Sequence, residues 1–162
     1  MELWDAYDEN LRRLEGVTLV RGEPIPDGVY HLACDVLVRH ADGQILLMQR
    51  DLAKRGGGKW EATAGGSALQ GETPQDCAVR ELREETGIAA NDLTELTREV
   101  NPTNHTYYVE YLCVTHCDKN SVILQEGETM AYRWVDVDTV KAMREDSLIT
   151  LRMRCYLDSL CD

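Results

Sequence analysis

One stretch of the sequence, residues 66–88 (GSALQGETPQDCAVRELREETGI), constrains this chain more than any other. It holds four glutamates and an arginine close together, in the order Gly66, Glu72, Arg80, Glu81, Glu84, Glu85 and Gly87. Carboxylates at the edge of a core are costly unless a positive charge joins them. Their oxygens suit a hard cation such as Mg²⁺, which keeps waters for a substrate phosphate. The stretch therefore predicts a site that holds a divalent metal against a phosphate.

The middle of this stretch predicts a helix over residues 74–86. Thr73 suits the N-cap, Pro74 suits the first helical position, and Asp76 can complete a capping box with Thr73. Gly87 stands where a helix commonly ends in a left-handed residue. The alternative to a metal site is a solvated acidic helix, stabilised by salt links between residues one turn apart. The complete spacing favours the metal site.

On a helical wheel, Glu81 and Glu85 border an apolar stripe formed by Ala78, Val79 and Leu82. Glu85 falls about 40° from Glu81, on the side of that stripe. Carboxylates in this position lie at the edge of the buried face, where a cation would stabilise them. We therefore expect Glu81 and Glu85 to be the principal metal ligands.

Three further residues and a glycine of the stretch have expected roles. Arg80 precedes Glu84 by one turn, so we expect it to orient that glutamate by a charge-assisted hydrogen bond. Glu84 is a further metal ligand, and Glu72 would reach the metal from the loop before the helix, directly or through water. Gly66 has no side chain, so its backbone can approach the site closely.

The rest of the chain predicts strands around this central helix and helices near the end. A first hairpin joins residues 3–8 and 17–21 around the turn at residues 8–10. Further strands are expected over 30–40, 44–50, 60–66, 93–100, 105–117 and 130–135, and helices over 137–145 and 147–160. This order indicates a mixed sheet covered on both faces.

The spacing Gly-x5-Glu-x7-Arg-Glu-Leu-x-Glu-Glu-x-Gly-Ile resembles the Nudix box, and every defined position of that pattern is matched. The resemblance extends over about residues 28–160, because the segment 60–66 also matches the usual approach to the box. It implies an α/β fold, the α/β/α sandwich of Nudix proteins with a mixed sheet. Residues 1–162 would form a single domain, in which residues 1–27 are an N-terminal hairpin extension of the core.

The resemblance implies hydrolysis of a nucleoside diphosphate linked to another group, by attack of water on phosphorus with Mg²⁺ or Mn²⁺ bridging phosphate oxygens. The metal ligands would be Gly66, through a nearby carbonyl, and Glu72, Glu81, Glu84 and Glu85. The catalytic residues would be Arg80, Glu81, Glu84 and Glu126. The general base is Glu81 or a glutamate on a later loop. In the segment LQEGETMAYRW we favour Glu126, with Glu128 as the alternative.

A basic segment, RDLAKRGGGK over residues 50–59, is the candidate for binding substrate phosphates. Its four cations face a single aspartate, and its three consecutive glycines make it flexible. The same composition suits an ordinary surface loop, and the two interpretations are evenly balanced. The residues expected to contact substrate are Arg50, Arg55, Lys59 and Trp60.

The formal net charge of −12 argues against binding to nucleic acid polymers or anionic membranes. A small-molecule diphosphate is repelled by the chain as a whole, so metal and local cations must offset this repulsion. No apolar run is long enough to cross a membrane, and the acidic N-terminus does not read as a signal peptide. With six scattered cysteines, this suggests the cytoplasm. Because many Nudix proteins dimerise, a homodimer is left open.

Cys113, His116 and Cys117 have the composition of a zinc cluster but not its geometry. They lie in a predicted strand, where four residues span about 13 Å. Two thiolates this far apart cannot both bind one zinc at about 2.3 Å. We therefore expect buried strand thiols.

Two other functions occur on the same fold. Isopentenyl-diphosphate isomerases are Nudix relatives that protonate an alkene with a cysteine, and the opening LWDAYDENLRRLEG…RGEPIPDGVYHLACDVLV is similar to their N-terminal region. The expected cysteine position near residues 60–63 holds none, and their box is degenerate whereas this one is intact, so we favour a hydrolase. A non-catalytic nucleotide sensor would usually have lost box carboxylates that are all present here.

Overall fold

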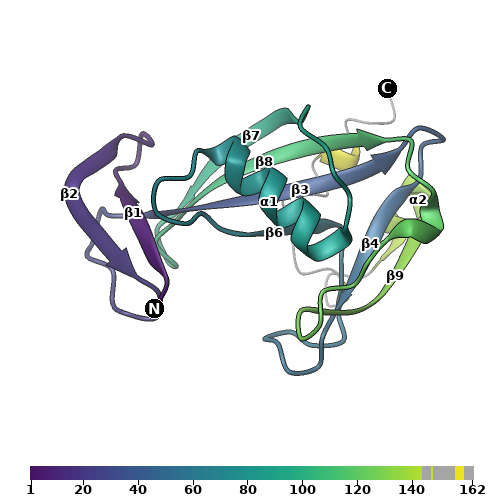
Figure 1. The fold of residues 1–162 in the computed structure, drawn as a ribbon, viewed down its shortest axis with the longest axis horizontal. Coiled ribbons are helices and arrows are strands. Elements are labelled where there is room, and N and C mark those ends of the chain that lie inside the picture. The colour runs from purple at the N-terminus through teal and green to yellow at the C-terminus, as the bar shows by residue number, and fades with distance from the viewer. Residues whose placement is uncertain (144–146, 148–155, 159–162) are drawn as a thin grey trace.

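The computed structural model describes residues 1–143, 147 and 156–158 (Figure 1). The strands are β1 (Leu3–Tyr7), β2 (Arg13–Val20), β3 (His31–His40), β4 (Ile45–Arg50), β5 (Trp60–Glu61), β6 (Thr63–Ser67), β7 (Thr94–Asn101), β8 (Thr106–Thr115) and β9 (Thr129–Val135). The helices are α1 (Pro74–Thr86), α2 (Val137–Ala142) and the short 3₁₀ helix η1 (Lys119–Ser121). Among the described residues, no helix is both long and apolar enough to cross a membrane. The helix predicted over 147–160 lies mostly outside the described residues.

A mixed sheet forms the centre of the protein, with β3 as its axis. β3 runs parallel to β8, from His31 opposite Thr106 to His40 opposite Thr115. On the other side of β3, strand β6 pairs antiparallel with residues 33–37. Strand β4 pairs antiparallel with β3 at Arg39, near the end of β3. β7 extends the sheet beyond β8, while β5 and β9 both pair with β4.

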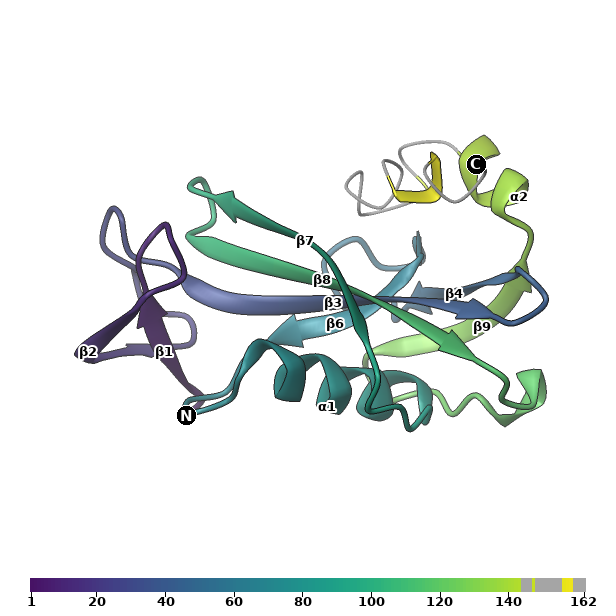
Figure 2. The ribbon, with the colours of Figure 1, turned by 90° about the horizontal axis from the view of Figure 1, so that it is seen from above.

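Helix α1 covers one face of the sheet and α2 lies over the opposite face (Figure 2). Successive side chains of β3 alternate between the two cores, because a strand points its side chains to opposite faces in turn. Cys34 and Val36 join Leu82 of α1 in one core, and Leu37 joins Val140 of α2 in the other. The arrangement is the expected α/β/α sandwich with a mixed sheet.

The helix predicted over residues 74–86 is confirmed with both of its caps. The Thr73 side chain accepts a hydrogen bond from the Asp76 backbone at 3.1 Å, and the Asp76 carboxylate accepts one from the Thr73 backbone. Gly87 closes the helix in the left-handed region, with φ of 74°. Local sequence chemistry therefore fixes both ends of the element that carries the box glutamates.

The single strand predicted over residues 60–66 is wrong. The chain breaks at Ala62 into β5, which pairs with β4, and β6, which pairs with β3. The break arises because the chain changes its partner strand at this point. An apolar pattern along one strand indicates which face is buried but does not name the neighbouring strand.

The predicted N-terminal hairpin is a separate two-stranded sheet at one end of β3 (Figure 1). Its own small core consists of the buried residues Trp4, Ala6 and Leu19. Tyr7 and Tyr30 exchange two backbone hydrogen bonds of 2.9 Å, and the ring of Trp4 stacks on His31 with the ring centroids 4.2 Å apart. These contacts hold the hairpin beside the start of β3.

Candidate active site and metal centre

Helix α1 turns two of its glutamates toward the sheet because its buried side chains lie on the same side. Cys77 and Leu82 are buried, whereas Val79 is only half-buried. The predicted apolar stripe is therefore corrected, since Cys77 and not Val79 completes it. This shift places Glu85 in the middle of the buried face and not at its border.

Glu85 lies between α1 and β6, where its Oε2 accepts a hydrogen bond from the Gly65 N–H at 3.2 Å. Burial raises the pKa of Glu85 well above its usual range, and the negative charges of Glu81 and Glu61 raise it further. The hydrogen bond from Gly65 lowers the pKa of Glu85 but does not offset these two causes. A nearby cation would restore the ionised form of this carboxyl group.

Glu81 packs directly against the backbone of Gly66. A Cβ atom at Gly66 would lie 2.6 Å from Oε1 and 2.9 Å from Oε2 of Glu81, so a side chain at this position would displace the carboxylate. Burial raises the pKa of Glu81, and a hydrogen bond from Arg80 partly offsets that rise. The glycine therefore allows a carboxylate to contact the strand that carries the expected carbonyl ligand.

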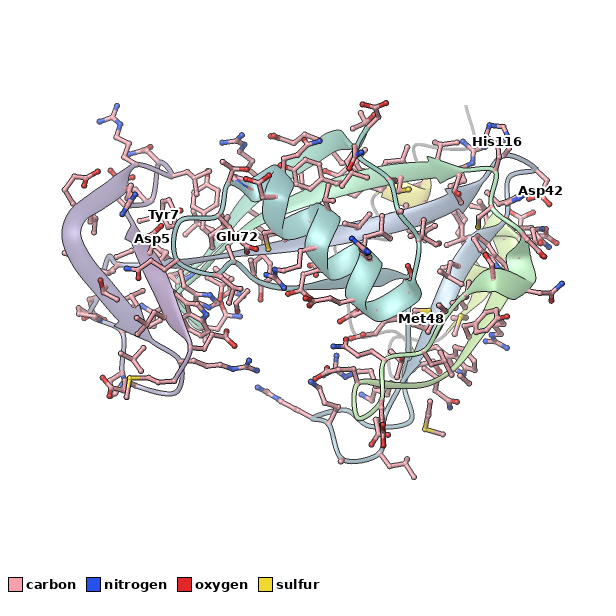
Figure 3. The ribbon with its side chains drawn as sticks, in the orientation of Figure 1. Asp5, Tyr7, Asp42, Met48, Glu72 and His116 are labelled. Atoms are coloured by element: carbon pink, nitrogen blue, oxygen red, sulfur yellow. The ribbon has the colours of Figure 1, made fainter. Side chains whose placement is uncertain are left out.

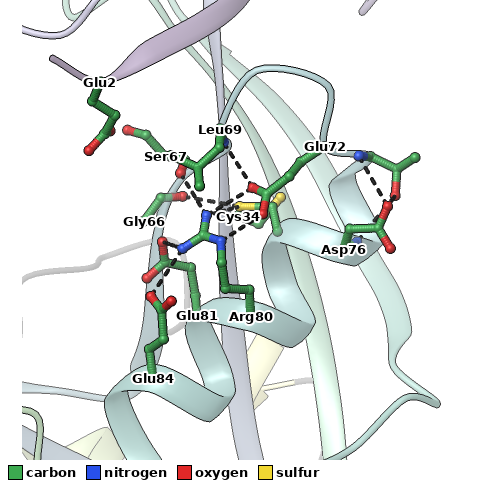
Figure 4. A network of polar contacts seen from close by, with 12 residues as sticks. Glu2, Cys34, Gly66, Ser67, Leu69, Glu72, Asp76, Arg80, Glu81 and Glu84 are labelled. Atoms are coloured by element: carbon green, nitrogen blue, oxygen red, sulfur yellow. Dashed lines mark hydrogen bonds and ion pairs between the residues drawn. The ribbon is translucent and has the colours of Figure 1, made fainter.

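Arg80 is the centre of a network that joins three glutamates (Figure 4). Its Nε and Nη2 donate to the two carboxylate oxygens of Glu72 at 2.6 and 2.9 Å. Its Nη1 donates to Glu81 at 2.6 Å and to Glu84 at 3.1 Å. Nη2 also donates to the Ser67 carbonyl at 3.1 Å. The predicted bond from Arg80 to Glu84 is present, but the bidentate pair is made with Glu72.

Glu72 has the opposite electrostatic character to Glu85. Burial alone would raise the pKa of Glu72, but hydrogen bonds from Arg80 and from the Leu69 N–H, the latter at 2.8 Å, outweigh burial and lower it. Because its two oxygens already accept bonds from protein donors, this geometry favours a role in holding Arg80 over direct contact with a metal.

Glu61, on β5, is a half-buried acid near Glu85 that the sequence pattern does not identify. Arg50 donates from Nη1 to Oε1 of Glu61 at 2.7 Å. Burial nevertheless raises the pKa of Glu61, and the charge of Arg50 only partly offsets it. The feature that could have identified Glu61 is its place on a strand, opposite the buried Met48.

A cavity of about 320 Å³ lies over this cluster and has three walls. The box forms the first wall, whose main polar residues are Glu81, Glu84 and Glu85. Two loops form the second wall through Lys54 and Glu128, and the hairpin forms the third wall through Glu2 and Arg21. Lys54 and Glu128 form an ion pair across the second wall. The sequence predicted the first wall, and long-range folding adds the other two.

Of the two later glutamates, the structure brings Glu128 to the cavity and leaves Glu126 outside it. Glu126 is exposed, whereas Glu128 lines the cavity beside Lys54. The geometry therefore favours Glu128 over Glu126. The turn at Gly127, with φ of 78°, separates the two side chains, and the sequence does not specify which of them turns inward.

The four residues expected to contact substrate are not among the described residues that line the cavity. Arg50 donates a hydrogen bond to Glu61. Trp60 lies on the α2 side of the sheet, where its ring centroid is 4.4 Å from the guanidinium carbon of Arg133. Arg55 and Lys59 belong to the same basic segment, from which Lys54 reaches the cavity. That segment therefore contributes to the cavity through Lys54, which is not one of the four residues expected to contact substrate.

The donors at the cavity fit a hard divalent cation, because they are carboxylate oxygens of Glu81, Glu84 and Glu85 beside the Gly66 backbone. In the part of the chain that the structure describes, no three His, Cys, Asp or Glu side chains converge closely enough to hold an ion. Arg80 already binds an oxygen of Glu81 and one of Glu84. Ligation of a metal would therefore share these two carboxylates with Arg80.

None of the described cysteines lines the cavity. The thiol of Cys34 donates to the Pro74 carbonyl at 3.2 Å, and that of Cys77 donates to the Gly66 carbonyl at 3.6 Å. Both are fully buried, as is Cys113 within β8. An acid thiol of the kind that isomerases use is thus not found at the described walls of the cavity.

Sequence comparison gives a family match. The profile described as NUDIX domain matches residues 29–153. A Listeria monocytogenes protein described as an uncharacterized Nudix hydrolase is 35% identical over 146 residues, covering 89% of this chain and 85% of that protein. The isopentenyl-diphosphate Delta-isomerase of Salmonella heidelberg is 30% identical over 116 residues, covering 68% of this chain and 64% of the isomerase.

Structure comparison gives the same fold. The crystal structure of DR0079 from Deinococcus radiodurans has a TM-score of 0.73 at 16% identity and covers 99% of this chain and 100% of that chain. The NUDIX domain of Shewanella oneidensis NrtR, solved with ADP ribose, has a TM-score of 0.63 at 16% identity and covers 82% of this chain and 89% of that chain. At these identities the likeness concerns the fold alone.

Proposed function

Because the chain belongs to the Nudix family and is a Nudix pyrophosphohydrolase, we propose that it hydrolyses a diphosphate linkage in a nucleoside diphosphate derivative. The cofactor in this proposal is Mg²⁺ or Mn²⁺, and the reaction is attack of water on phosphorus. The partner is a small molecule that enters the cavity over α1.

The observation that carries this proposal is an excess of half-buried acid at and beside the cavity. Burial raises the pKa of Glu81, Glu85 and Glu61. The neighbouring guanidinium groups of Arg80 and Arg50 are already bound to carboxylates. A divalent cation would offset the remaining negative charge and would also attract a diphosphate to a chain of net charge −12.

The residues of the cavity have distinct proposed roles. Glu81, Glu84, Glu85 and the carbonyl of Gly66 hold the metal. When bound, the metal neutralises charge on the diphosphate and lowers the pKa of a water molecule. Arg80 orients Glu81 and Glu84 through their shared hydrogen bonds, and Glu72 fixes Arg80.

Glu128 is the proposed general base, with Glu81 as the alternative. Glu128 lines the cavity and is oriented by its ion pair with Lys54. A carboxylate in this place can accept the proton of the attacking water. Lys54 can release Glu128 in part and bind a phosphate oxygen when the diphosphate enters.

The direct test is a panel of nucleoside diphosphate derivatives incubated with Mg²⁺ or Mn²⁺. ADP-ribose belongs in the panel because the NrtR domain of the same fold was solved with it. We expect release of a nucleoside monophosphate from at least one compound and loss of that release in EDTA. Absence of hydrolysis across the panel with both metals would support the non-catalytic sensor instead.

A matched pair of variants tests the base. Glu128→Gln should lower kcat by about 10²-fold, the ordinary contribution of a general base. Glu126→Gln makes the same chemical change at an exposed neighbour outside the cavity and should leave kcat within about twofold. Equal activity of the two variants would transfer the base role to Glu81.

The similarity to isopentenyl-diphosphate isomerases favours a second candidate function. Cys34 and Cys77 are completely buried and neither lines the cavity, which argues against it, because neither thiol can deliver a proton to a substrate there. Incubation with isopentenyl diphosphate and Mg²⁺ decides between the two functions. Formation of dimethylallyl diphosphate at a rate comparable with hydrolysis would overturn our choice.

A further inference from the structure

The N-terminal hairpin supplies a wall of the cavity, although it lies far from the box in the sequence. Glu2 and Arg21 line the cavity together with Glu81 and Glu84. The two hairpin residues are neighbours, because the Arg21 N–H donates to the Glu2 carbonyl at 3.0 Å. In Figure 4, Glu2 lies on the same side of Arg80 as Glu81 and Glu84. The hairpin therefore borders the metal-binding wall.

Arg21 is anchored through a short chain of polar contacts. Its Nη1 donates to Oε2 of Glu2 at 2.9 Å, and Oε1 of Glu2 accepts from the indole N–H of Trp4 at 2.7 Å. Trp4 is itself buried in the hairpin core. The Arg21 side chain is 61% exposed, so its guanidinium presents further N–H donors toward solvent and the cavity.

The hairpin is locked to the loop that carries the first box glutamate. The Gln70 N–H donates to the Leu3 carbonyl at 3.0 Å, and the Gly71 N–H donates to Oδ2 of Asp5 at 2.8 Å. Asp5 is 4% exposed and lies between the hairpin and the loop that leads to Glu72 (Figure 3). The hairpin that carries Arg21 is therefore held against the loop that precedes the box.

The other cations among the described residues that line the cavity, Arg80 and Lys54, are paired with carboxylates. The donors of Arg80 are occupied by glutamates and the Ser67 carbonyl, and Lys54 on the second wall is paired with Glu128. Burial alone would raise the pKa of Glu2, but hydrogen bonds from Trp4 and Arg21, and then the charges of Arg21 and Arg80, lower it. Glu2 is thus a carboxylate that holds the Arg21 guanidinium at the cavity.

We propose that Arg21 is a specificity-determining residue that binds a phosphate oxygen of the substrate diphosphate at the hairpin end of the cavity, with Glu2 as its positioning residue. The proposal rests on the proposed function, because it assumes that the cavity receives a diphosphate. An exposed pair such as Arg21–Glu2 is weak, so a phosphate can join or replace the carboxylate. Guanidinium groups bind phosphate through two parallel N–H bonds. A cavity of about 320 Å³ is small enough that a bound diphosphate lies against its walls.

Three variants and two probes test this subsite. The probes are Mg²⁺-pyrophosphate and the non-hydrolysable α,β-methylene-ADP with Mg²⁺, and the measurement is the Kd by calorimetry. Arg21→Gln should raise both Kd values by about tenfold, and Arg21→Lys by less, because an ammonium lacks the bidentate fork. Arg12→Gln removes the same charge from the same hairpin at an exposed position outside the cavity and should change Kd by less than about twofold.

Kinetics on whichever compound is hydrolysed separates binding from chemistry. If Arg21 binds substrate and transition state alike, Arg21→Gln raises KM by about tenfold and leaves kcat close to that of the unmutated protein. Glu2→Gln should produce a smaller rise in KM, and this rise should vanish in the Arg21→Gln background, since Glu2 acts through Arg21. A purely structural hairpin contact would not give this dependence.

Each outcome bears on the proposal in a defined way. Equal Kd values for Arg21→Gln and Arg12→Gln, with both variants folded by circular dichroism, overturn it. Failure of the unmutated protein to bind either probe also overturns it. If pyrophosphate binds and Arg21→Gln weakens that binding, but no derivative is hydrolysed, then the proposed function fails while the Arg21 subsite stands.

Discussion

Glu72 and Glu85 belong to the same motif, yet the fold gives them opposite surroundings. Glu72 accepts two bonds from Arg80 and one from the backbone, and its pKa is lowered although burial alone would raise it. Glu85 accepts a backbone bond at 3.2 Å, and burial followed by the charges of Glu81 and Glu61 raises its pKa. The first carboxylate is satisfied by the protein itself. The second has unmet charge, which indicates where a cation belongs.

This difference separates two tasks within one acidic cluster. The Arg80 network stabilises the arrangement of loop and helix before any metal arrives. In the proposed function, a cation stabilises the region around Glu85 and Glu61, so without it these acids are placed for function at a cost in stability. Substitutions on the two sides should therefore affect turnover and folding in different proportions.

The largest expected effect on turnover is that of Glu85→Gln. Loss of this proposed metal ligand should lower kcat/KM by on the order of a thousandfold, because metal-assisted charge stabilisation amounts to several kcal/mol. The fold should be kept, since glutamine has the same shape. Steady-state hydrolysis with Mg²⁺, compared with Glu95→Gln on the exposed face of β7, measures the effect. A variant with more than a tenth of the original activity would remove Glu85 from the metal site.

Arg80→Lys should come next, with kcat/KM lower by about 10²-fold and the free energy of unfolding lower by about 2 kcal/mol. One ammonium cannot hold both oxygens of Glu72 and also reach Glu81 and Glu84. Arg83→Lys is the matched control on the same helix, because Arg83 is exposed. Urea unfolding and kinetics on both variants are needed. If Arg80→Lys loses activity without losing stability, then the network orients the site but does not support the fold.

Gly66→Ala should lower turnover by about tenfold while the protein stays folded. The new Cβ would meet the carboxylate of Glu81 at 2.6 Å, and that side chain can move aside. Gly65→Ala is the contrasting variant, because its Cβ would lie 2.2 Å from the Cys34 carbonyl of the backbone, which cannot move aside. We expect Gly65→Ala to reduce stability by about 3 kcal/mol. Thermal unfolding that is the same for both variants would contradict this distinction.

The smallest expected effect is that of Glu85→Gln on the free energy of unfolding, measured with urea in the absence of metal. The raised pKa of Glu85 means that the folded protein binds this proton more tightly than the unfolded chain. Its contribution is therefore full at acidic pH and is lost as pH rises through the raised pKa. In EDTA at neutral pH, Glu85→Gln should be more stable than the unmutated protein by on the order of 1 kcal/mol, and this difference should disappear in acid.

In the same urea experiment, substitution of Glu72 should change the free energy of unfolding in the opposite direction to substitution of Glu85. Its lowered pKa contributes stability above the usual carboxyl range, and this contribution is lost as pH falls through the lowered value. Glu72→Gln should therefore be less stable than the unmutated protein at neutral pH, with the difference shrinking in acid. The same sign for both variants at neutral pH would refute the contrast between the two glutamates.

Much of the fold and of the first wall follows from local sequence. The ends of α1 depend on Thr73, Asp76 and Gly87, whose effects act within a few residues, and the structure has both ends as expected. The hairpin and the order of strands also follow from periodicity and turns. The single strand predicted over 60–66 failed because strand pairing is a long-range choice.

The sequence by itself determined the box spacing, the helix that carries it and the family, because these are encoded in consecutive residues and a helix converts spacing directly into a face. The tertiary structure decided the rest. It places Glu128, and not Glu126, at the cavity and pairs Arg80 with Glu72. It also brings Lys54 and Arg21 to the cavity. These choices join segments tens of residues apart, and which of them meet depends on the packing of the whole sheet, which the spacing within any one segment does not encode.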